Sequence, residues 1–516
     1  MQEENKKTIL HNNKLKKVIM NVTFTENEIS SLIDQAMTKS ETLIKNNLWI
    51  EGESILKQIL RIDPDHENAL RLLSQLYISQ KKSLDAIPLY EKILEKIPND
   101  YESLNNLALC YAANKNKEKS LELFKKCIFF YPEIPSTYCN LALQYKNEGN
   151  HEESYKIYQQ GIERLPQDPN IRYNYAIELA EQKQFDEAIK QYKKSIELNP
   201  NFPQAHFNLS LLNLFIGNYE EGWKGYDWRF DYIDVFRRFK ERFTGQEWKG
   251  EDGTNKTILV YNEQGVGDTI QFARYLPKLK EKGFKVILEV PFELMDIMYQ
   301  SEGIDEVFLL RSKNIPNYDY HVSIGSLPAL LQIYKPFWDG PYIKPTGSSQ
   351  KYFNNYKQFK KVGICWAGNP IHRNDKNRSC FLKEFKVIND IYNVKLFSLQ
   401  KDVRPRFWGD MGVVDLTEDC RDMGVVNMGD MLIDFNYTAA IMKCMDYIVT
   451  VDSAIAHLAG AMNLPCFLLL PYMADFRWGV EGDKTDWYPS IKLVRQTEPG
   501  NYTDPMRKIA HEIKQL

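Results

Sequence analysis

Three short segments in the C-terminal half of the sequence contain side chains suited to chemistry on a phosphorylated substrate. The first contains Gly265, Gly267 and Asp268, where two glycines allow a close approach of the backbone to a ligand and a carboxylate opens a helical stretch. A carboxylate in that position can act as a general base on a hydroxyl group. We therefore expect Asp268 to be the catalytic base, with Glu263 and His321 as the next candidates.

The second segment follows a predicted strand and is rich in cations. It begins at Trp366, continues past Asn369, and then contains Arg373, Lys376 and Arg378. Guanidinium and ammonium groups stabilise a diphosphate that gains negative charge as it leaves, so we expect this segment to bind the donor in a transfer reaction. A solvated basic loop is the alternative interpretation of the same residues.

The third segment joins a buried strand directly to a helix. The strand ends in Asp452, Ser453 and Ala454, and small side chains at a helix start leave backbone N–H groups free to bind a phosphate. His457 lies about one turn farther along this helix, where it can face the same ligand. We predict that the first three residues bind the donor and that His457 takes part in catalysis; a purely structural histidine is the alternative.

These segments must be positioned by an alternation of strands and helices that begins near residue 256. The expected strands lie at 257–262, 285–290, 306–310 and 320–323, and then at 361–367, 395–399, 446–451, 466–470 and 491–495. The pattern predicts an α/β region of two Rossmann-like lobes, at 256–345 and 360–516, which form the GT-B fold and bind ligands at the carboxyl ends of their strands. An oxidoreductase is the rival for such a fold, but Ile270 stands where the third glycine of a dinucleotide fingerprint would be.

The N-terminal half is built from a repeat of 34 residues, because prolines recur at 64, 98, 132, 166 and 200. In the same register, small residues stand at 86, 120, 154, 188 and 222, and aromatic residues stand at 90, 124, 158, 192 and 226. Small residues let paired helices approach each other, and the period is that of tetratricopeptide repeats. We predict an α-solenoid, a tetratricopeptide superhelix of five to six helix pairs at 30–230, followed by a junction at 231–255.

A series of asparagines recurs with the same period, at Asn106, Asn140, Asn174 and Asn208. Asparagine is a mediocre helix former, so its repetition inside a helix calls for a reason. Side-chain amides on one face of the array can hydrogen-bond the backbone of an extended peptide. We predict that this series binds a peptide acceptor; the alternative is that each asparagine hydrogen-bonds a neighbouring repeat.

The three segments and the repeats together resemble a known family. The runs Glu-Gln-Gly-Val-Gly-Asp-Thr-Ile-Gln-Phe-Ala-Arg-Tyr-Leu-Pro (263–277), Trp-Ala-Gly-Asn-Pro-Ile-His-Arg-Asn-Asp (366–375) and Asp-Ser-Ala-Ile-Ala-His-Leu-Ala-Gly-Ala (452–461) look like those of bacterial tetratricopeptide proteins with a heptosyltransferase-like, family 9 glycosyltransferase domain. The resemblance implies transfer of a sugar from a nucleotide-diphosphate sugar to a protein or glycan acceptor, with inversion at the anomeric carbon. It also implies that Asp268 is the base. The asparagine series is similar to the ladder of protein O-linked N-acetylglucosamine transferases.

Two departures from that family concern the donor. The Thr-Gly of heptosyltransferases is Ser453-Ala454 here, and their lysine near the second segment has no unambiguous counterpart, so ADP-heptose is not implied. The Asp-x-Asp pair typical of metal-dependent sugar transferases occurs only at Asp63 and Asp65, inside a repeat turn, so we expect no metal or other cofactor. The rival to an enzyme is a catalytically inactive, sugar-nucleotide-binding scaffold that assembles protein partners.

Composition and charge narrow the class of protein. The chain has 516 residues and a net charge of -3, which provides no general attraction to nucleic acid. Eight cysteines are scattered with no pair at two-residue spacing, which favours reduced thiols. Residues 1–29 are polar and predict a disordered leader, and no apolar run reaches the roughly 18 residues of a membrane span. We therefore expect a cytoplasmic protein.

Overall fold

The computed structural model describes residues 25–515, except residue 373 and residues 402–405, 408–412 and 415–419. The chain forms two compact units, residues 1–178 and 179–516. Most of the expected leader at 1–29 lies outside the described residues, but its end belongs to a helix that begins at Glu26. Thr25 and Glu28 form a capping box there, in which each side chain accepts a hydrogen bond from the backbone of the other. No helix in the described ranges is long and apolar enough to cross a membrane.

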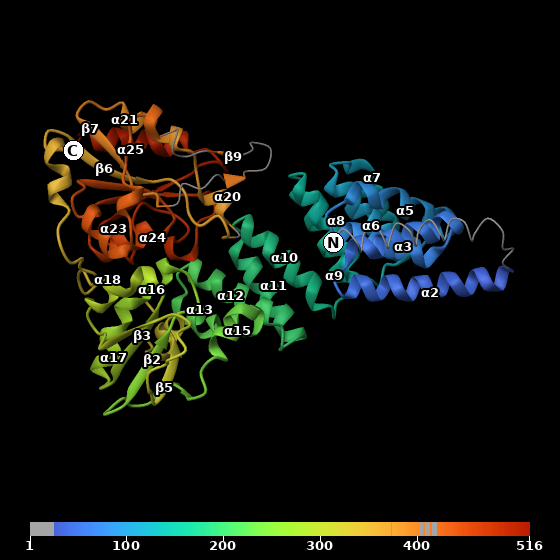
Figure 1. The fold of residues 1–516 in the computed structure, drawn as a ribbon, viewed down its shortest axis with the longest axis horizontal. Coiled ribbons are helices and arrows are strands. Elements are labelled where there is room, and N and C mark those ends of the chain that lie inside the picture. Colours follow the sequence, from blue (N-terminus) through green and yellow to red (C-terminus); the bar gives the residue numbers. More distant parts are fainter. Residues whose placement is uncertain (1–24, 373, 402–405, 408–412, 415–419, 516) are drawn as a thin grey trace, which may run out of the picture. The chain divides into compact units, whose positions relative to one another are not determined.

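Paired helices build the first unit (Figure 1, blue to green). Its elements are α2 (Glu26–Lys45), α3 (Trp49–Ile62), α4 (Glu67–Ser79), α5 (Ser83–Lys96), α6 (Tyr101–Ala113), α7 (Lys117–Phe130), α8 (Pro135–Asn147), α9 (His151–Arg164) and most of α10 (Pro169–Glu181). At the repeated small position, Ala86, Ser120 and Ser154 are completely buried. The aromatic residues Tyr90 and Phe124 are buried in the same core. Packing therefore confirms the predicted repeat register.

The last helices of the repeat array and the helices of the junction belong to the second unit. They are α11 (Phe185–Leu198), α12 (Pro203–Phe215), α13 (Tyr219–Tyr226), α14 (Arg229–Tyr232) and α15 (Asp234–Lys240). Trp223 is 1% exposed, and its ring contacts those of Phe272 and Phe476 at centroid distances of 5.8 and 5.9 Å. The boundary between compact units thus falls near residue 178 and not at 230, the expected end of the array, because the apolar faces of these helices pack against the α/β elements.

The first sheet of the second unit is entirely parallel. Its strands are β1 (Gln246–Glu247), β2 (Thr257–Tyr261), β3 (Lys285–Val290), β4 (Glu306–Leu309) and β5 (Tyr320–Ser323), in the order β1-β5-β2-β3-β4. From β2 the chain moves outward through β3 to β4 and then returns to β5 on the other side of β2. The strand order therefore reverses between β2 and β5, which is where doubly wound sheets usually bind ligands.

The second sheet is also parallel and has six strands (Figure 1, orange and red). They are β6 (Lys360–Cys365), β7 (Val394–Ser398), β10 (Val426–Asn427), β11 (Tyr447–Val451), β12 (Cys466–Leu470) and β13 (Ile491–Arg495), in the order β10-β7-β6-β11-β12-β13. The order reverses between β6 and β11. All nine predicted strands are confirmed within two residues at either end, whereas β1 and β10 were not predicted because two-residue strands have no periodicity. A small antiparallel pair, β8 (Arg406–Phe407) and β9 (Val413–Val414), completes the strands.

Short helices connect the strands. They are α16 (Val266–Phe272), α17 (Leu276–Glu281), α18 (Met295–Tyr299), α19 (Leu327–Leu330), α20 (Asp375–Arg378), α21 (Lys386–Asn389), α23 (Phe435–Met442), α24 (Ala454–Ala461) and α25 (Thr503–Gln515), with single 3-10 turns between some of them. The helical stretch that Asp268 was expected to open begins earlier, at Val266, and is interrupted at Ala273–Tyr275. Pro277 lacks the N–H group that a continuous helix would need, so α17 starts anew beside it.

Candidate functional site

The second and third segments meet where the second sheet reverses its strand order. β6 leads into Trp366, and the neighbouring strand β11 leads into Asp452 and Ser453. The Ser453 hydroxyl lies 3.1 Å from the hydroxyl of Thr450 and 3.9 Å from the Cys365 sulfur on β6. Two of the three predicted segments are therefore adjacent, at the edge where parallel sheets bind ligands.

The first turn of α24 is available to an anion. Ser453 precedes the helix in an extended conformation, with φ -152° and ψ 172°, and its side chain makes no capping hydrogen bond. The backbone N–H groups of a helix start have no partner inside the helix and carry a partial positive charge. This arrangement fits the predicted roles of Ser453 and Ala454 in binding a phosphate.

Gly267 brings the first segment to the third. A Cβ atom on this glycine would lie 2.8 Å from Cδ2 of His457 and 3.4 Å from Cα of Ala454. The sequence suggested that Gly267 lets a ligand approach the backbone. Its missing side chain instead allows α16 to pack against the start of α24. Gly265, in contrast, has only the Asp268 carboxylate close to the position of a Cβ atom, at 3.0 Å.

Asp268 is held at the start of α16 and faces the third segment. Its Oδ2 atom accepts a hydrogen bond from the Gly265 N–H at 2.9 Å, and its Oδ1 atom pairs with Nη2 of Arg477. The Nη1 atom of Arg477 donates to Asp475 at 2.7 Å, and its Nε atom donates to Gln271. Arg477 therefore joins α16 to the loop after β12, a role that the sequence did not predict.

Several buried nitrogen donors of the second unit make no hydrogen bond to the described residues. They include Nε2 of Gln271 on α16, Nε1 of Trp366 after β6, and Nε2 of Gln496 after β13. Nε of Arg378 makes no hydrogen bond either, but it lies 3.6 Å from Oδ1 of Asp375. Buried donors are normally paired, so these atoms are candidates for contact with a ligand.

The second segment provides one cation in a defined position. The guanidinium of Arg378 packs on Gly368, where a Cβ atom would lie 2.5 Å from Nη2. The side chain of Asn369 is exposed and stabilises a turn, because its Oδ1 atom accepts from the Ile371 N–H at 3.0 Å. Lys376 is exposed, and the predicted donor residue Arg373 lies outside the described residues. The donor role predicted for this segment thus depends mainly on Arg378.

Charges around the third segment shift two pKa values. Burial and the negative charge of Asp475 raise the pKa of Asp452 to about 6, although Arg378 and Arg477 act in the opposite direction. Burial and the charge of Arg477 hold the pKa of His457 well below its usual range, so its imidazole is neutral. Asp452 is consequently the group here whose charge changes near neutral pH.

His457 is packed tightly among aromatic residues. Its Nδ1 atom shares a hydrogen bond with the Tyr488 hydroxyl at 3.0 Å, and its ring stacks on Trp478 at 5.3 Å between centroids. A neutral and buried imidazole cannot neutralise a phosphate, although it can position α24 against α16. These contacts favour the structural histidine that the sequence left open, and the catalytic role of His457 stays a prediction.

The aromatic side chains of the loop at 486–489 are part of the core. Trp487 and Tyr488 are 1% and 0% exposed. Arg274 lies over the Trp487 ring and donates to its carbonyl oxygen at 2.9 Å. These rings are therefore not exposed to a ligand, and a cation–π contact with a buried arginine stabilises their position.

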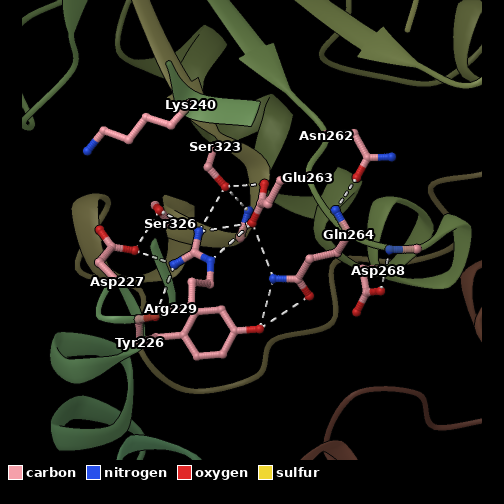
Figure 2. A network of polar contacts seen from close by, with 12 residues as sticks. Tyr226, Asp227, Arg229, Lys240, Asn262, Glu263, Gln264, Asp268, Ser323 and Ser326 are labelled. Carbon is pink, nitrogen blue, oxygen red and sulfur yellow. Dashed lines mark hydrogen bonds and ion pairs between the residues drawn. The ribbon is translucent and has the colours of Figure 1, made fainter. Parts of the chain in front are cut away.

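The corresponding reversal point of the first sheet is filled by protein (Figure 2). Arg229 on α14 is completely buried, and its guanidinium donates to Glu263 at 3.0 Å and to Ser323 at 2.9 Å. The Ser323 hydroxyl donates to the other oxygen of Glu263 at 2.5 Å. Glu263 is thus not a reserve base. His321 is not one either, because it is buried and its Nε2 atom donates to the Gly245 carbonyl at 3.1 Å.

This network continues toward Asp268. Figure 2 shows Gln264 between Tyr226 and the Glu263 carboxylate, with Asp268 beside it. The Gln264 amide donates to the Tyr226 hydroxyl at 3.0 Å and to Glu263 at 3.2 Å. The helix α13, which ends at Tyr226, therefore helps to position the loop that carries the candidate base.

Three of the four repeated asparagines make contacts inside the repeat array. The side-chain amide of Asn140 donates to Oδ1 of Asn105 at 2.8 Å. The amide of Asn106 donates to the Tyr90 hydroxyl at 3.2 Å, and that of Asn174 reaches the Cys139 sulfur at 3.5 Å. Each partner lies in the preceding repeat, which is the alternative that the sequence left open. Asn208 lies on α12 in the second unit.

Comparisons with known proteins identify the repeats. Models of the tetratricopeptide repeat match residues 89–122 and 135–168, and a further TPR repeat model matches residues 178–214. These segments of the chain are tetratricopeptide repeats, and such repeats are surfaces for binding other proteins. The matches do not extend into the residues that form the two sheets.

Similar proteins cover parts of the chain. Protein FlbA of Caulobacter vibrioides is 23% identical over 329 residues, which cover 58% of this chain and 53% of that protein. The crystal structure of TTC0263, a tetratricopeptide protein of Thermus thermophilus, covers 35% of this chain and 99% of its own, at 16% identity and a TM-score of 0.29. PilF of Pseudomonas aeruginosa covers 41% of this chain and 94% of its own, at 15% identity and a TM-score of 0.32.

Proposed function

We propose that the α/β part of this chain is a glycosyltransferase of the GT-B fold, which transfers a sugar from a nucleotide-diphosphate sugar to a protein or glycan acceptor. The tetratricopeptide repeats recruit that acceptor. The observation that carries the proposal is the meeting of α16 and α24, which brings the carboxylate of Asp268 and the guanidinium of Arg477 close to a helix start.

Each group has a role that suits transfer. The first turn of α24 and Arg378 bind the diphosphate, whose negative charge grows as it leaves. Asp268 accepts the proton of the attacking hydroxyl group. Attack from the side opposite the leaving group inverts the anomeric carbon. These residues perform every step of the proposed transfer, and a metal has no role in it.

One observation favours a second candidate, an inactive scaffold that binds a sugar nucleotide and protein partners. Asp268 is paired with Arg477, so an acceptor hydroxyl group would have to compete with a guanidinium group for this carboxylate. In a scaffold this ion pair would only hold α16 to the loop after β12. The two candidates bind the same ligand and differ in whether sugar is transferred.

A ligand screen followed by a transfer assay tests both candidates on the full-length chain. Thermal unfolding is first measured with a panel of nucleotide sugars and nucleoside diphosphates, because a ligand at 100 times its dissociation constant stabilises a protein by about 2.7 kcal/mol. A protein stabilised by none of them is not a sugar-nucleotide protein. Release of nucleoside diphosphate with a protein or glycan acceptor then distinguishes an enzyme from a scaffold.

A matched pair of variants locates the ligand. Ser453→Trp places a large ring at the start of α24 and should abolish the stabilisation by the ligand. Ser348→Trp introduces the same ring at an exposed loop position and should leave ligand binding unchanged. Equal binding by both variants would show that the diphosphate lies elsewhere.

A further inference from the structure

Both carboxylate oxygens of Asp268 are engaged. Oδ2 accepts the Gly265 N–H at 2.9 Å, and Oδ1 is paired with Arg477. An acceptor hydroxyl that approaches this carboxylate must therefore compete with a guanidinium group. Transfer requires that Arg477 leave Asp268 at the right moment.

Arg477 also lies near a second position where an anion can bind, the first turn of α24. It pairs with Asp268, whose neighbour Gly267 packs on Ala454, so its guanidinium lies near the first turn of α24. Arg378 packs on Gly368, after the strand β6 that pairs with β11. A diphosphate bound at that turn would thus lie near two guanidinium groups, which bind phosphate oxygens in a bidentate manner.

The contacts of Arg477 allow such an exchange. Nη1 is bound to Asp475 at 2.7 Å, and only Nη2 is bound to Asp268. Asp475 and Arg477 lie in the same loop after β12, so their contact can persist while Nη2 changes its partner. The side chain is 9% exposed, which strengthens its interaction with whichever anion is present.

We propose, as an extension of the transferase function, that binding of the donor draws Arg477 from Asp268 to the diphosphate and so frees the base. The acceptor oxygen then forms a bond to the anomeric carbon, and its proton passes to Asp268. The bond from the anomeric carbon to the diphosphate oxygen breaks, and its electron pair leaves with the nucleoside diphosphate, which Arg477 neutralises. Arg477 acts as the positioning residue that links the two events.

A double-mutant cycle on nucleotide affinity tests this exchange. The probe is the nucleoside diphosphate that stabilises the full-length protein most, and the measurement is isothermal titration calorimetry. If Asp268 holds Arg477 back, Asp268→Asn should tighten binding about five- to tenfold, because a binding-competent state that is populated in only a fraction of molecules lowers the apparent affinity by that fraction. Arg477→Gln should weaken binding tenfold or more.

The combination of the two variants is decisive. In the Arg477→Gln background, Asp268→Asn should no longer tighten binding, because no guanidinium remains to be released. A purely structural ion pair predicts unchanged or weaker binding for Asp268→Asn, and that result overturns the proposal. Asp319→Asn removes an exposed carboxylate that pairs with Lys256 at 3.2 Å in the first sheet and should not change the affinity.

Two further measurements keep the test conclusive. Arg477→Lys retains the charge and should keep more affinity than Arg477→Gln, and if Arg477→Gln does not fold the cycle is run with Arg477→Lys. If the wild-type protein binds no nucleoside diphosphate, both the transferase function and this proposal are excluded. If the wild type binds a nucleoside diphosphate and Asp268→Asn does not bind it more tightly, only the exchange of Arg477 is excluded.

Discussion

Gly267 and His457 are in direct contact, because a Cβ atom on the glycine would lie 2.8 Å from the imidazole Cδ2 atom. Gly267→Ala should therefore push α16 away from α24 and destabilise the second unit by about 1–3 kcal/mol, as overpacking of a dense core does. The measurement is urea unfolding followed by tryptophan fluorescence, since only Trp49 of the nine tryptophans lies in the first unit.

A second substitution tests the cause of that loss. His457→Ala removes the atoms that the new methyl group would strike, so the double variant should be less destabilised than the sum of the single variants. Strict additivity would show that the loss arises from some other contact of Gly267.

Asp268→Asn should lower the transfer rate at saturating donor about a hundredfold or more, which is the usual effect of removing a general base. The variant retains the hydrogen-bond acceptor for the Gly265 N–H, so α16 should stay folded. Initial rates of nucleoside diphosphate release provide the measurement, with circular dichroism as the check on folding. An unchanged rate would exclude this carboxylate, and neither Glu263 nor His321 is placed to replace it.

Asp452 makes the stability of the second unit depend on pH. Its pKa rises from 3.8 to about 6 on folding because of burial and Asp475, so the folded protein binds this proton more tightly than the unfolded chain. Its contribution to stability is favourable at low pH and is lost as the pH rises from about 4 to about 6.

Asp452→Asn should remove that loss. Above pH 7 the variant should be more stable than the wild type by up to about 3 kcal/mol, and the difference should disappear near pH 4. Urea unfolding at a series of pH values provides the comparison. A variant that is less stable than the wild type at pH 8 would show that the charged carboxylate is stabilised in the folded protein.

The Arg229–Glu263 pair should contribute strongly to the second unit. Both side chains are 0% exposed, so Arg229→Met leaves a buried carboxylate without its partner and should cost about 3–5 kcal/mol of unfolding free energy. The exposed pair of Lys285 and Glu306 is a matched control, and Lys285→Met should change stability by less than about 1 kcal/mol. Equal losses in urea unfolding would contradict the burial argument.

Asn140→Ala separates the two interpretations of the asparagine series. It removes a hydrogen bond of 2.8 Å to Asn105 and should destabilise the repeat array by about 1 kcal/mol. Asn147→Ala, at the exposed end of the same helix, should have a smaller effect. The check is thermal unfolding by far-UV circular dichroism, together with the Michaelis constant for a protein acceptor. A raised Michaelis constant at unchanged stability would assign Asn140 to peptide binding.

Periodic patterns determined much of the fold from the sequence alone. The 34-residue register placed Ala86 and Tyr90 in the core, and short apolar runs located all nine long strands within two residues. Such patterns succeed because helices and buried strands impose a spacing on apolar side chains that is visible without any tertiary contact. The loops at 366 and 452 were predicted to meet for a related reason, since both follow parallel strands.

Contacts between distant segments were decided only by the tertiary structure. Asp268 and Arg477 are 209 residues apart and pair because Gly267 lets α16 pack on α24, which no local pattern encodes. The same holds for Arg229, whose guanidinium fills the reversal point of the first sheet, and for Tyr488, which is buried against His457. A sequence shows which side chains can carry charge or accept a proton, but their partners, burial and pKa values depend on which surfaces meet after folding.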